Sequence, residues 1–257
     1  MRFKWYGTAT LLFESGKTRL LIDPYDPPFA HTAPISKEEA CSFDAILITH
    51  PHVDHFKDID TFSQGKLPVY VSEIGIQLAR KNGLNYTCMQ SIAVGDVLSV
   101  GNFLIRVYPA SHCKFDIYSV FRILFSPRTW SHLPDCISLL KDASKFKIKS
   151  EDVLAFKISD HSTTVFVFGS AGMDCRAVYP TDVDLLIFPY QGRKRMDKVL
   201  IPFLQKIKPK TVTVDHFDDA FPPISTSVNL RRFLPTVTTH SPNSAILVPQ
   251  PNIWYEI

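Results

Sequence analysis

The amino-acid sequence predicts an α/β sandwich, with β-sheets inside and helices outside. The first reason is that short strand-like runs alternate with helical patterns in both halves of the chain. The second is composition: hydrophobic residues make up 45% and charged residues 21% of the 257 residues, as in a soluble protein with a sizeable core. We expect one domain, residues 1–257, because the chain is short for two.

The first half consists mainly of strand-like segments bounded by turn residues. Strands are expected at residues 2–7, 9–15, 18–24, 43–50 and 65–72. The fourth segment, FDAILITH, is a continuous apolar run, as expected for a buried strand. A helix is expected next, at 73–83, where the spacing is helical and the final glycine offers a cap. Residues 96–112 are expected to form a hairpin.

The second half repeats the alternation. We expect strands at residues 152–159, 163–170, 183–190, 210–216 and 244–249, the last being the final strand of the chain. Amphipathic patterns predict helices at 195–209 and 226–237. Strands that alternate with helices in this way favour sheets whose outer faces are covered by helices.

Residues 113–150 do not fit this alternation. The segment is aromatic, has a partly helical period and separates two expected strands, so we interpret it as a helical insertion. It could be an extra helical pair packed on the core, or a lid that forms an apolar wall over an active site. Its aromatic residues with near-helical spacing allow the same two interpretations; they are Phe115, Tyr118, Phe121 and Phe125.

Charge, cysteine usage and the N-terminal sequence narrow the class of protein. The formal net charge is +3, which gives no strong indication of nucleic acid or a membrane surface as a partner. The sequence has no signal-peptide pattern and no run of about 18 apolar residues. The five cysteines are an odd number, widely scattered and without CxxC spacing, so we expect reduced thiols in a cytoplasmic protein.

The stretch THPHVDH, residues 49–55, concentrates three of the chain's nine histidines and one aspartate. Neutral imidazoles and carboxylates are ligands of zinc and similar ions. The HExxH pattern, which places two histidines four residues apart on one helix face, is absent here. The stretch therefore predicts a loop-based site at a strand end, for one metal or for two, with the ligands His50, His52, Asp54 and His55.

Two metals need further ligands, and other strand ends supply histidines. The segment 96–112 ends in His112, and the strand at 210–216 ends in His216. Functional groups at the carboxyl ends of strands are a common way to build a site in α/β proteins. The strand at 163–170 ends instead in Ser170, where a carboxylate would have been more useful.

THPHVDH matches the HxHxDH signature of the metallo-β-lactamase superfamily, and the resemblance extends along nearly the whole chain. The opening WYGTATLLFESGKTRLLIDPY resembles the first strands of that family, and VDHFDDAF resembles the segment with its last metal histidine. Within the superfamily, GTA in the opening and HFD near the end resemble the branch that contains phosphorylated-ascorbate lactonases and N-acyl-phosphatidylethanolamine phospholipase D enzymes.

The resemblance implies a fold and a set of ligands. The fold is a four-layer αβ/βα sandwich with the site at one edge of the paired sheets. By the same resemblance, one metal is bound by His50, His52 and His112. A second metal is bound by Asp54, His55 and His216. Asp23, at the end of the opening segment, would orient a ligand histidine.

The sequence departs from the family at one position. The family has an aspartate that bridges both metals in a GDTG-like turn, whereas this chain reads FGSAGMD and has Ser170 there. Without that aspartate, two divalent ions, Asp54 and a bridging hydroxide leave the site at roughly +2 instead of +1. We therefore expect a weaker second metal, or an anionic substrate that supplies the charge, unless Asp174 replaces the carboxylate in a rebuilt turn.

These features predict a metal-dependent hydrolase. A metal lowers the pKa of its bound water to about 7, and the metal-bound hydroxide attacks a carbonyl or phosphoryl centre while Asp54 orients it. Zinc is the expected ion, and manganese or iron suit the same ligands. The charge count favours a small anionic phosphodiester, a lactone or a related ester. A phosphate could be held by the basic run Arg193, Lys194 and Arg195, which otherwise is a solvated helix start.

The alternative is a metal-binding or sensory protein of the same fold with reduced or lost catalysis, which Ser170 suggests. A nuclease of this superfamily would need an additional domain over the site, for which 257 residues leave little room. The expected partner is therefore a small-molecule substrate. The sequence does not indicate the oligomeric state.

Overall fold

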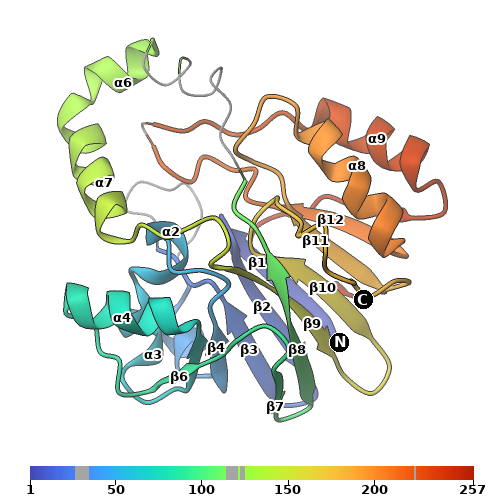
Figure 1. The fold of residues 1–257 in the computed structure, drawn as a ribbon, viewed down its shortest axis with the longest axis horizontal. Coiled ribbons are helices and arrows are strands. Elements are labelled where there is room, and N and C mark those ends of the chain that lie inside the picture. Colours follow the sequence, from blue (N-terminus) through green and yellow to red (C-terminus); the bar gives the residue numbers. More distant parts are fainter. Residues whose placement is uncertain (27–34, 114–120, 122–124, 223) are drawn as a thin grey trace.

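Two β-sheets of seven strands each face one another at the centre of the computed structural model, which describes residues 1–26, 35–113, 121, 125–222 and 224–257 (Figure 1). The first sheet has the order β14 (Trp254–Glu256), β1 (Arg2–Gly7), β2 (Thr10–Ser15), β3 (Thr18–Ile22), β4 (Ala45–Leu47), β5 (Val69–Val71) and β6 (Met89–Ser91). The second has the order β13 (Ala245–Leu247), β12 (Thr211–Asp215), β11 (Leu185–Pro189), β10 (Thr164–Phe168), β9 (Val153–Ser159), β8 (Phe103–Ala110) and β7 (Val97–Val100).

Helices cover the outer face of each sheet. The first sheet is covered by α1 (Lys37–Ala40), α2 (Val53–Phe56), α3 (Ile59–Ser63) and α4 (Glu73–Asn82). The second is covered by α8 (Met196–Ile207), the 3₁₀ turn η1 (Leu230–Arg232) and α9 (Phe233–His240). One apolar cluster lies between the sheets and one lies under each helical layer. The predicted four-layer αβ/βα sandwich is therefore confirmed.

The local sequence explains the main elements. Every residue of β4 and of β11 is buried, because the inner strands of each sheet are covered on both faces, and this requires continuous apolar runs. The helix α4 stops at Gly83, which has φ 74° and donates its N–H back to the last turn, as expected for a glycine cap. The expected hairpin at 96–112 is β7 paired antiparallel with β8.

Two sequence predictions are wrong in ways that matter. The segment 244–249 is not the final strand, because β14 follows it and pairs antiparallel with β1, so that Lys4 faces Trp254. The expected loop-based site is only partly a loop. His52 caps the short helix α2, and Asp54 and His55 lie on its single turn. A carboxylate in the first turn of a helix is favoured by the helix dipole, and Asp54 occupies that turn.

One edge of the sandwich collects the strand ends that carry the predicted ligands. Asp23 follows β3, Thr49 and His50 follow β4, His112 follows β8 and His216 follows β12. Asp23 and His216 have φ values of 46° and 55°, in the left-handed region that non-glycine residues rarely adopt. Such conformations cost about 1–3 kcal/mol each and cluster at functional sites, so the surrounding contacts must enforce them.

The expected insertion at 113–150 contains two described helices, α6 (Pro127–Ser131) and α7 (Leu133–Lys145), which project from the sandwich beside α2 (Figure 1). Phe146, just after α7, packs edge-on against Phe56 of α2, with ring centroids 6.2 Å apart. Phe121 and Phe125 stack on each other and are 49% and 75% exposed, so they are not core residues. Phe115 and Tyr118 lie outside the described residues.

Two further predictions concern the whole chain. None of the five cysteines, all in the described part of the chain, forms a disulfide. No helix among the described residues combines the length and the apolar character needed to cross a membrane.

Candidate metal centre

The first predicted group of ligands, His50, His52 and His112, converges in the structure. One ligand atom from each residue lies within 4.8 Å of the other two. The ring of His52 stands edge-on to both neighbours, with centroid distances of 4.7 Å to His50 and 4.6 Å to His112. These residues come from the ends of β4 and β8, which belong to different sheets, so the group forms only when the sandwich is assembled.

The second predicted group, Asp54, His55 and His216, converges beside the first, again within 4.8 Å. The carboxylate atom Oδ2 of Asp54 lies 2.9 Å from Nε2 of His216 and 3.3 Å from Nε2 of His55. The two groups are neighbours, because the rings of His50 and His55 have centroids only 4.0 Å apart.

Two histidines of the first group are oriented by hydrogen bonds between their Nδ1 atoms and neighbouring oxygen atoms. Nδ1 of His50 lies 3.0 Å from the hydroxyl of Thr49, and Nδ1 of His112 lies 2.9 Å from the carbonyl oxygen of Cys113. A carbonyl oxygen can only accept, so Nδ1 of His112 carries the proton. Nε2 then carries the lone pair that is available for a metal, which is the usual arrangement of ligand histidines.

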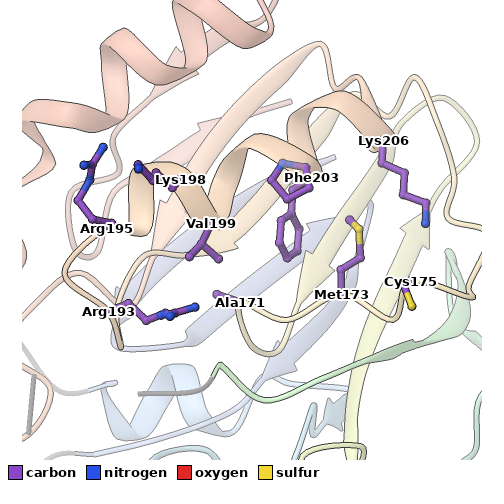
Figure 2. Close-up of a pocket in the computed structure, with 10 residues that line it drawn as sticks. Ala171, Met173, Cys175, Arg193, Arg195, Lys198, Val199, Phe203 and Lys206 are labelled. Carbon is purple, nitrogen blue, oxygen red and sulfur yellow. The ribbon is translucent and has the colours of Figure 1, made fainter. Parts of the chain in front are cut away.

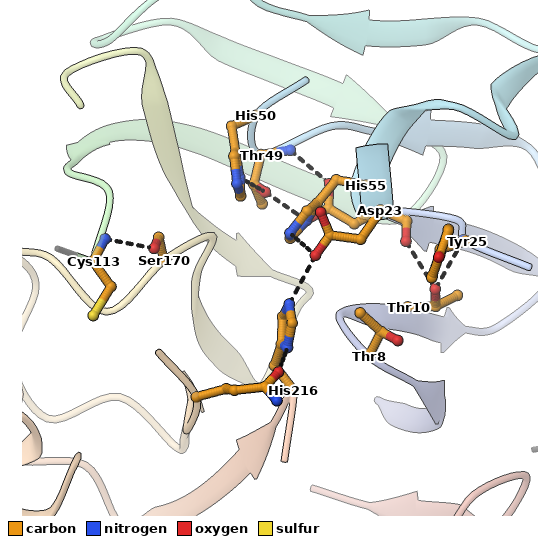
Figure 3. Close-up of polar contacts among 12 residues, drawn as sticks. Thr8, Thr10, Asp23, Tyr25, Thr49, His50, His55, Cys113, Ser170 and His216 are labelled. Atoms are coloured by element: carbon orange, nitrogen blue, oxygen red, sulfur yellow. Dashed lines mark hydrogen bonds and ion pairs between the residues drawn. The ribbon is translucent and has the colours of Figure 1, made fainter. Parts of the chain in front are cut away.

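The second group is oriented in the same way. Nδ1 of His55 lies 2.7 Å from Oδ2 of Asp23 (Figure 3). Nδ1 of His216 lies 2.7 Å from Oε1 of Gln191. Both oxygens accept from an imidazole N–H, so Nε2 of each ring is left facing Asp54. The structure thus places Asp23 beside His55, and the expectation that Asp23 orients a metal ligand stays a prediction.

Asp23 also connects the two groups. Its carboxylate accepts hydrogen bonds from the backbone N–H of Thr49 at 2.7 Å and from the Thr49 hydroxyl at 2.5 Å. The Thr49 hydroxyl in turn accepts from His50, so one buried carboxylate supports His55 directly and His50 through Thr49. A second reason for the fixed position of Asp23 is that its carbonyl oxygen accepts from the Thr10 hydroxyl at 2.8 Å.

The electrostatics of the first group suit metal ligation. Burial holds the pKa of His50 well below its usual value and lowers the pKa of His52 to about 4. Burial also lowers the pKa of His112. These three imidazoles are therefore neutral near pH 7, and neutral imidazole is the form that binds a metal.

In the second group the pKa of a histidine is raised instead of lowered. Burial lowers the pKa of His55, but the carboxylates of Asp54 and Asp23 outweigh this and raise it to about 10. Burial likewise opposes ionisation of Asp54, but His55 and His216 hold the pKa of Asp54 well below its usual range. This environment favours a positive charge among the three residues. A divalent cation fits such a position, and the His/Asp donor set is one that zinc, manganese and iron share.

A contact between two distant motifs supports His216. The N–H of His216 donates to the carbonyl oxygen of Thr8 at 2.7 Å, and the N–H of Thr8 donates to Asp218 at 2.9 Å. Thr8 belongs to the GTA sequence and Asp218 to HFD, so the two motifs are parts of one structural unit. This contact explains how the chain holds His216 at a positive φ.

Asp174 belongs to neither group of candidate ligands, and the Ser170 hydroxyl is bonded beside the first group. The Ser170 hydroxyl accepts a hydrogen bond from the backbone N–H of Cys113 at 3.0 Å, next to His112 (Figure 3). The Asp174 carboxylate accepts from the backbone N–H of Arg176 at 2.9 Å and pairs with its guanidinium. Ser170 does not supply the negative charge of the family's bridging aspartate. Asp23 supplies part of that charge, because its carboxylate lies against His55; the net charge of +2 expected from the sequence did not include Asp23.

The basic run divides into residues with different roles. Arg195 is bound to the carboxylate of Asp197, with its Nε 2.9 Å from Oδ1. Arg193 and Arg195 both line a pocket beside α8, whereas Lys194 does not.

Sequence reasoning missed Thr49, Gln191 and Asp218. Only their positions in the sequence could have indicated Thr49 and Gln191 as site residues: Thr49 adjoins the histidine motif, and Gln191 follows a predicted strand.

Comparisons with known proteins identify the family of the chain. A family model described as "Beta-lactamase superfamily domain" matches residues 2–213. A protein from Thermococcus kodakarensis, named UPF0173 metal-dependent hydrolase, is 26% identical over 232 residues, which cover 88% of this chain and 88% of that protein. This chain spans about half the length of further curated relatives that it matches.

Solved structures share the fold at low sequence identity. The metallo-beta-lactamase fold protein YhfI from Bacillus subtilis has a TM-score of 0.67 and 18% identity, over 100% of this chain and 98% of that one. Igni18, a metallo hydrolase from Ignicoccus hospitalis, has a TM-score of 0.66 and 16% identity with the same coverage. At these identities the likeness shows the fold alone.

Proposed function

The chain belongs to the β-lactamase superfamily and is a metal-dependent hydrolase, and we propose that its two groups of ligands hold two divalent ions that act on an anionic ester. The observation that carries this proposal is the convergence of six donors in two adjacent groups, with four of the histidines oriented through Nδ1. Both sheets contribute ligands, so we propose that residues 1–257 act as one domain, with 113–150 as an insertion beside the centre.

The proposed ligands match the chemistry of the reaction. His50, His52 and His112 hold the first ion, and Asp54, His55 and His216 hold the second. When bound, such ions supply a Lewis acid and water that ionises near neutral pH. Zinc is the first choice for an imidazole-rich site, with manganese and iron as alternatives.

Asp54 has the position of a residue that orients the attacking water. Both imidazole contacts of Asp54 use Oδ2, so we assign Oδ1 to that water, from which it accepts a hydrogen bond. His55 and His216 hold the pKa of Asp54 well below its usual range, so the carboxylate is ionised and orients the water without taking its proton. Asp23 keeps His55 in place, because its carboxylate is buried and bonded to Thr49 as well.

The substrate class follows from charge and from the two connected motifs. A site with two ions and few carboxylate ligands favours an anionic substrate, and Arg193 lies in a pocket two residues beyond Gln191, the partner of His216. GTA and HFD resemble the branch with phosphorylated-ascorbate lactonases and N-acyl-phosphatidylethanolamine phospholipase D enzymes. We therefore propose a phosphodiester, a lactone or a related ester as the substrate.

A substrate panel with metal analysis tests this proposal. The protein is loaded separately with zinc, manganese and ferrous iron and assayed on bis(p-nitrophenyl) phosphate, a γ-lactone, p-nitrophenyl acetate and an amide. We expect hydrolysis of at least one anionic or cyclic ester, lost in the chelated protein and in His52→Ala. Two bound ions without hydrolysis of any panel member would favour the metal-binding or sensory alternative.

A further inference from the structure

A pocket of about 780 Å³ lies between α8 and the turn that follows β10 (Figure 2). None of the six metal-ligand candidates lines this pocket. Its apolar wall consists of Val199 and Phe203, which are one helical turn apart on α8 and face Ala171 and Met173 across the space. Phe203 is only 2% exposed and anchors this wall in the core, whereas Val199 and Met173 are partly exposed and offer the apolar surface.

The charged residues that line the pocket are all cationic, and they differ in how they are engaged. Arg195 is bound to Asp197, and Lys206 donates to the carbonyl oxygen of Ala177 at 2.9 Å. Arg193 and Lys198 make no ion pair with any residue that the structure describes. Figure 2 shows the Arg193 guanidinium extending toward Ala171, below Val199, so it lies at one end of the apolar wall.

Both walls of the pocket are attached to the metal centre. Ala171 follows Ser170, whose hydroxyl bonds to the residue after His112, and Gly172 forms a β-bridge with Ser111, the residue before His112. On the other side, Arg193 is two residues from Gln191, which contacts His216. Two residues of chain span at most roughly 7 Å, so the backbone of Arg193 lies close to that of Gln191 and hence to the candidate ligand His216.

We propose that this pocket binds a non-reacting arm of the substrate that carries an oxyanion on Arg193 and an apolar segment between Val199 and Met173. This inference rests on the proposed function, because it assigns the pocket to the ester that the metal centre hydrolyses. A guanidinium fork matches a phosphate or a carboxylate equally well in geometry, so the shared chemistry is an oxyanion next to an apolar chain. The apolar wall distinguishes this ligand from a free inorganic anion.

Binding is tested by calorimetry on the metal-loaded protein, with hexyl phosphate, hexanoate, hexanol and inorganic phosphate as probes. We expect one or both hexyl anions to bind more tightly than inorganic phosphate and than hexanol. Arg193→Gln should weaken the hexyl anion about 10- to 100-fold, because one charge-assisted bond is lost. Arg193→Gln leaves the metal ligands in place. Any binding of the anion to the metal ions is therefore the same in the wild type and in the variant and does not contribute to the difference in affinity. Lys208→Gln, which removes a charge just beyond α8 and outside the pocket, is the matched control and should have no effect.

Two further results decide the apolar part and the link to the substrate. Val199→Asn should remove the preference for hexyl phosphate over inorganic phosphate. For whichever panel ester is hydrolysed, an anionic hexyl analogue should show a raised KM and an unchanged kcat in Arg193→Gln. Equal affinities in the wild type and Arg193→Gln, or no preference for the hexyl chain, would overturn the inference while hydrolysis persists. If the wild type hydrolyses no ester of the panel but still binds the hexyl anion through Arg193, the proposed function is overturned and the assignment of the pocket is not.

Discussion

The two groups of ligands lie side by side but are built on opposite electrostatic principles. The first group has three imidazoles and no carboxylate, and burial keeps their pKa values low. The second group has Asp54 among its members and Asp23 behind His55, and these carboxylates raise the pKa of His55 to about 10. Without a metal, the first group is neutral and the second holds a proton.

This difference separates two ways to prepare a cation site. The first group offers lone pairs that need no deprotonation, so a metal competes only with water. The second group offers negative charge, but a metal must displace the proton of His55. Asp23 contacts His55 and also supports His50 through Thr49, so the two groups share one structural support although they differ in charge.

The largest effect is expected for Asp54→Asn. This change keeps the shape of the side chain but removes the one carboxylate of the second group, which we propose orients the attacking water. We expect kcat to fall by about 10²-fold or more, because the water loses its orientation and the second ion loses its one carboxylate ligand. The second ion should be lost while the first remains. Steady-state kinetics with elemental analysis measures both, and two retained ions with a kcat near that of the wild type would contradict the assignment.

A pair of changes in the supporting residues separates the groups. Thr49→Val removes the hydroxyl that contacts His50, and Gln191→Leu removes the oxygen that contacts His216. Loss of such a support weakens metal binding about 10- to 100-fold. We therefore expect Thr49→Val to weaken the first ion and Gln191→Leu the second, as measured by competition with a chromophoric chelator. Equal effects of both variants on both ions would mean that the groups act as one.

The pH dependence of metal binding tests the same contrast. Since the pKa of His55 is raised to about 10, its proton competes with the second ion at neutral pH. Affinity for that ion should therefore rise by about tenfold per pH unit from pH 7 toward 9. The pKa of His52 is about 4, so the first ion should show no such rise. Titration of the metal-free protein, corrected for the chelator, measures both, and parallel curves for the two ions would contradict this difference.

The sequence indicated the candidate ligands because their pattern is local. HxHxDH is contiguous, and the end of a strand is a recognisable place for His112 and His216. Apolar runs and helical periods likewise predicted most strands and helices of the sandwich. The short helix α2 was missed because it is one turn long, which is too short for a helical period to show.

The supporting contacts could not be predicted, because they depend on which strand ends become neighbours. Gln191 and His216 are 25 residues apart, and Thr8 and Asp218 are 210 apart, so only the assembled sheets bring them together. The same holds for the basic run. Its three residues look equivalent in sequence, but Asp197 engages Arg195 while Arg193 reaches the pocket.

The smallest effects are expected at Ser170, where the contrast between the groups can be changed by one residue. Its hydroxyl accepts from the N–H of Cys113, so Ser170→Ala should loosen the position of His112 and weaken the first ion a few-fold, in line with about 1 kcal/mol for one hydrogen bond. Ser170→Asp keeps an acceptor for that N–H and adds a carboxylate at the position where the family has its bridging residue.

The added charge should act mainly on the second ion, because the first already has three neutral ligands in place. We expect Ser170→Asp to raise the affinity of the second ion by about tenfold, equivalent to about 1.4 kcal/mol, and to bring occupancy closer to two metals per chain. Activity toward an anionic substrate should fall, because the carboxylate repels the substrate's charge. Metal titration of the wild type, Ser170→Ala and Ser170→Asp measures these shifts. If the wild type already binds two ions equally tightly and Ser170→Asp changes neither, Asp23 and Asp54 supply sufficient charge by themselves.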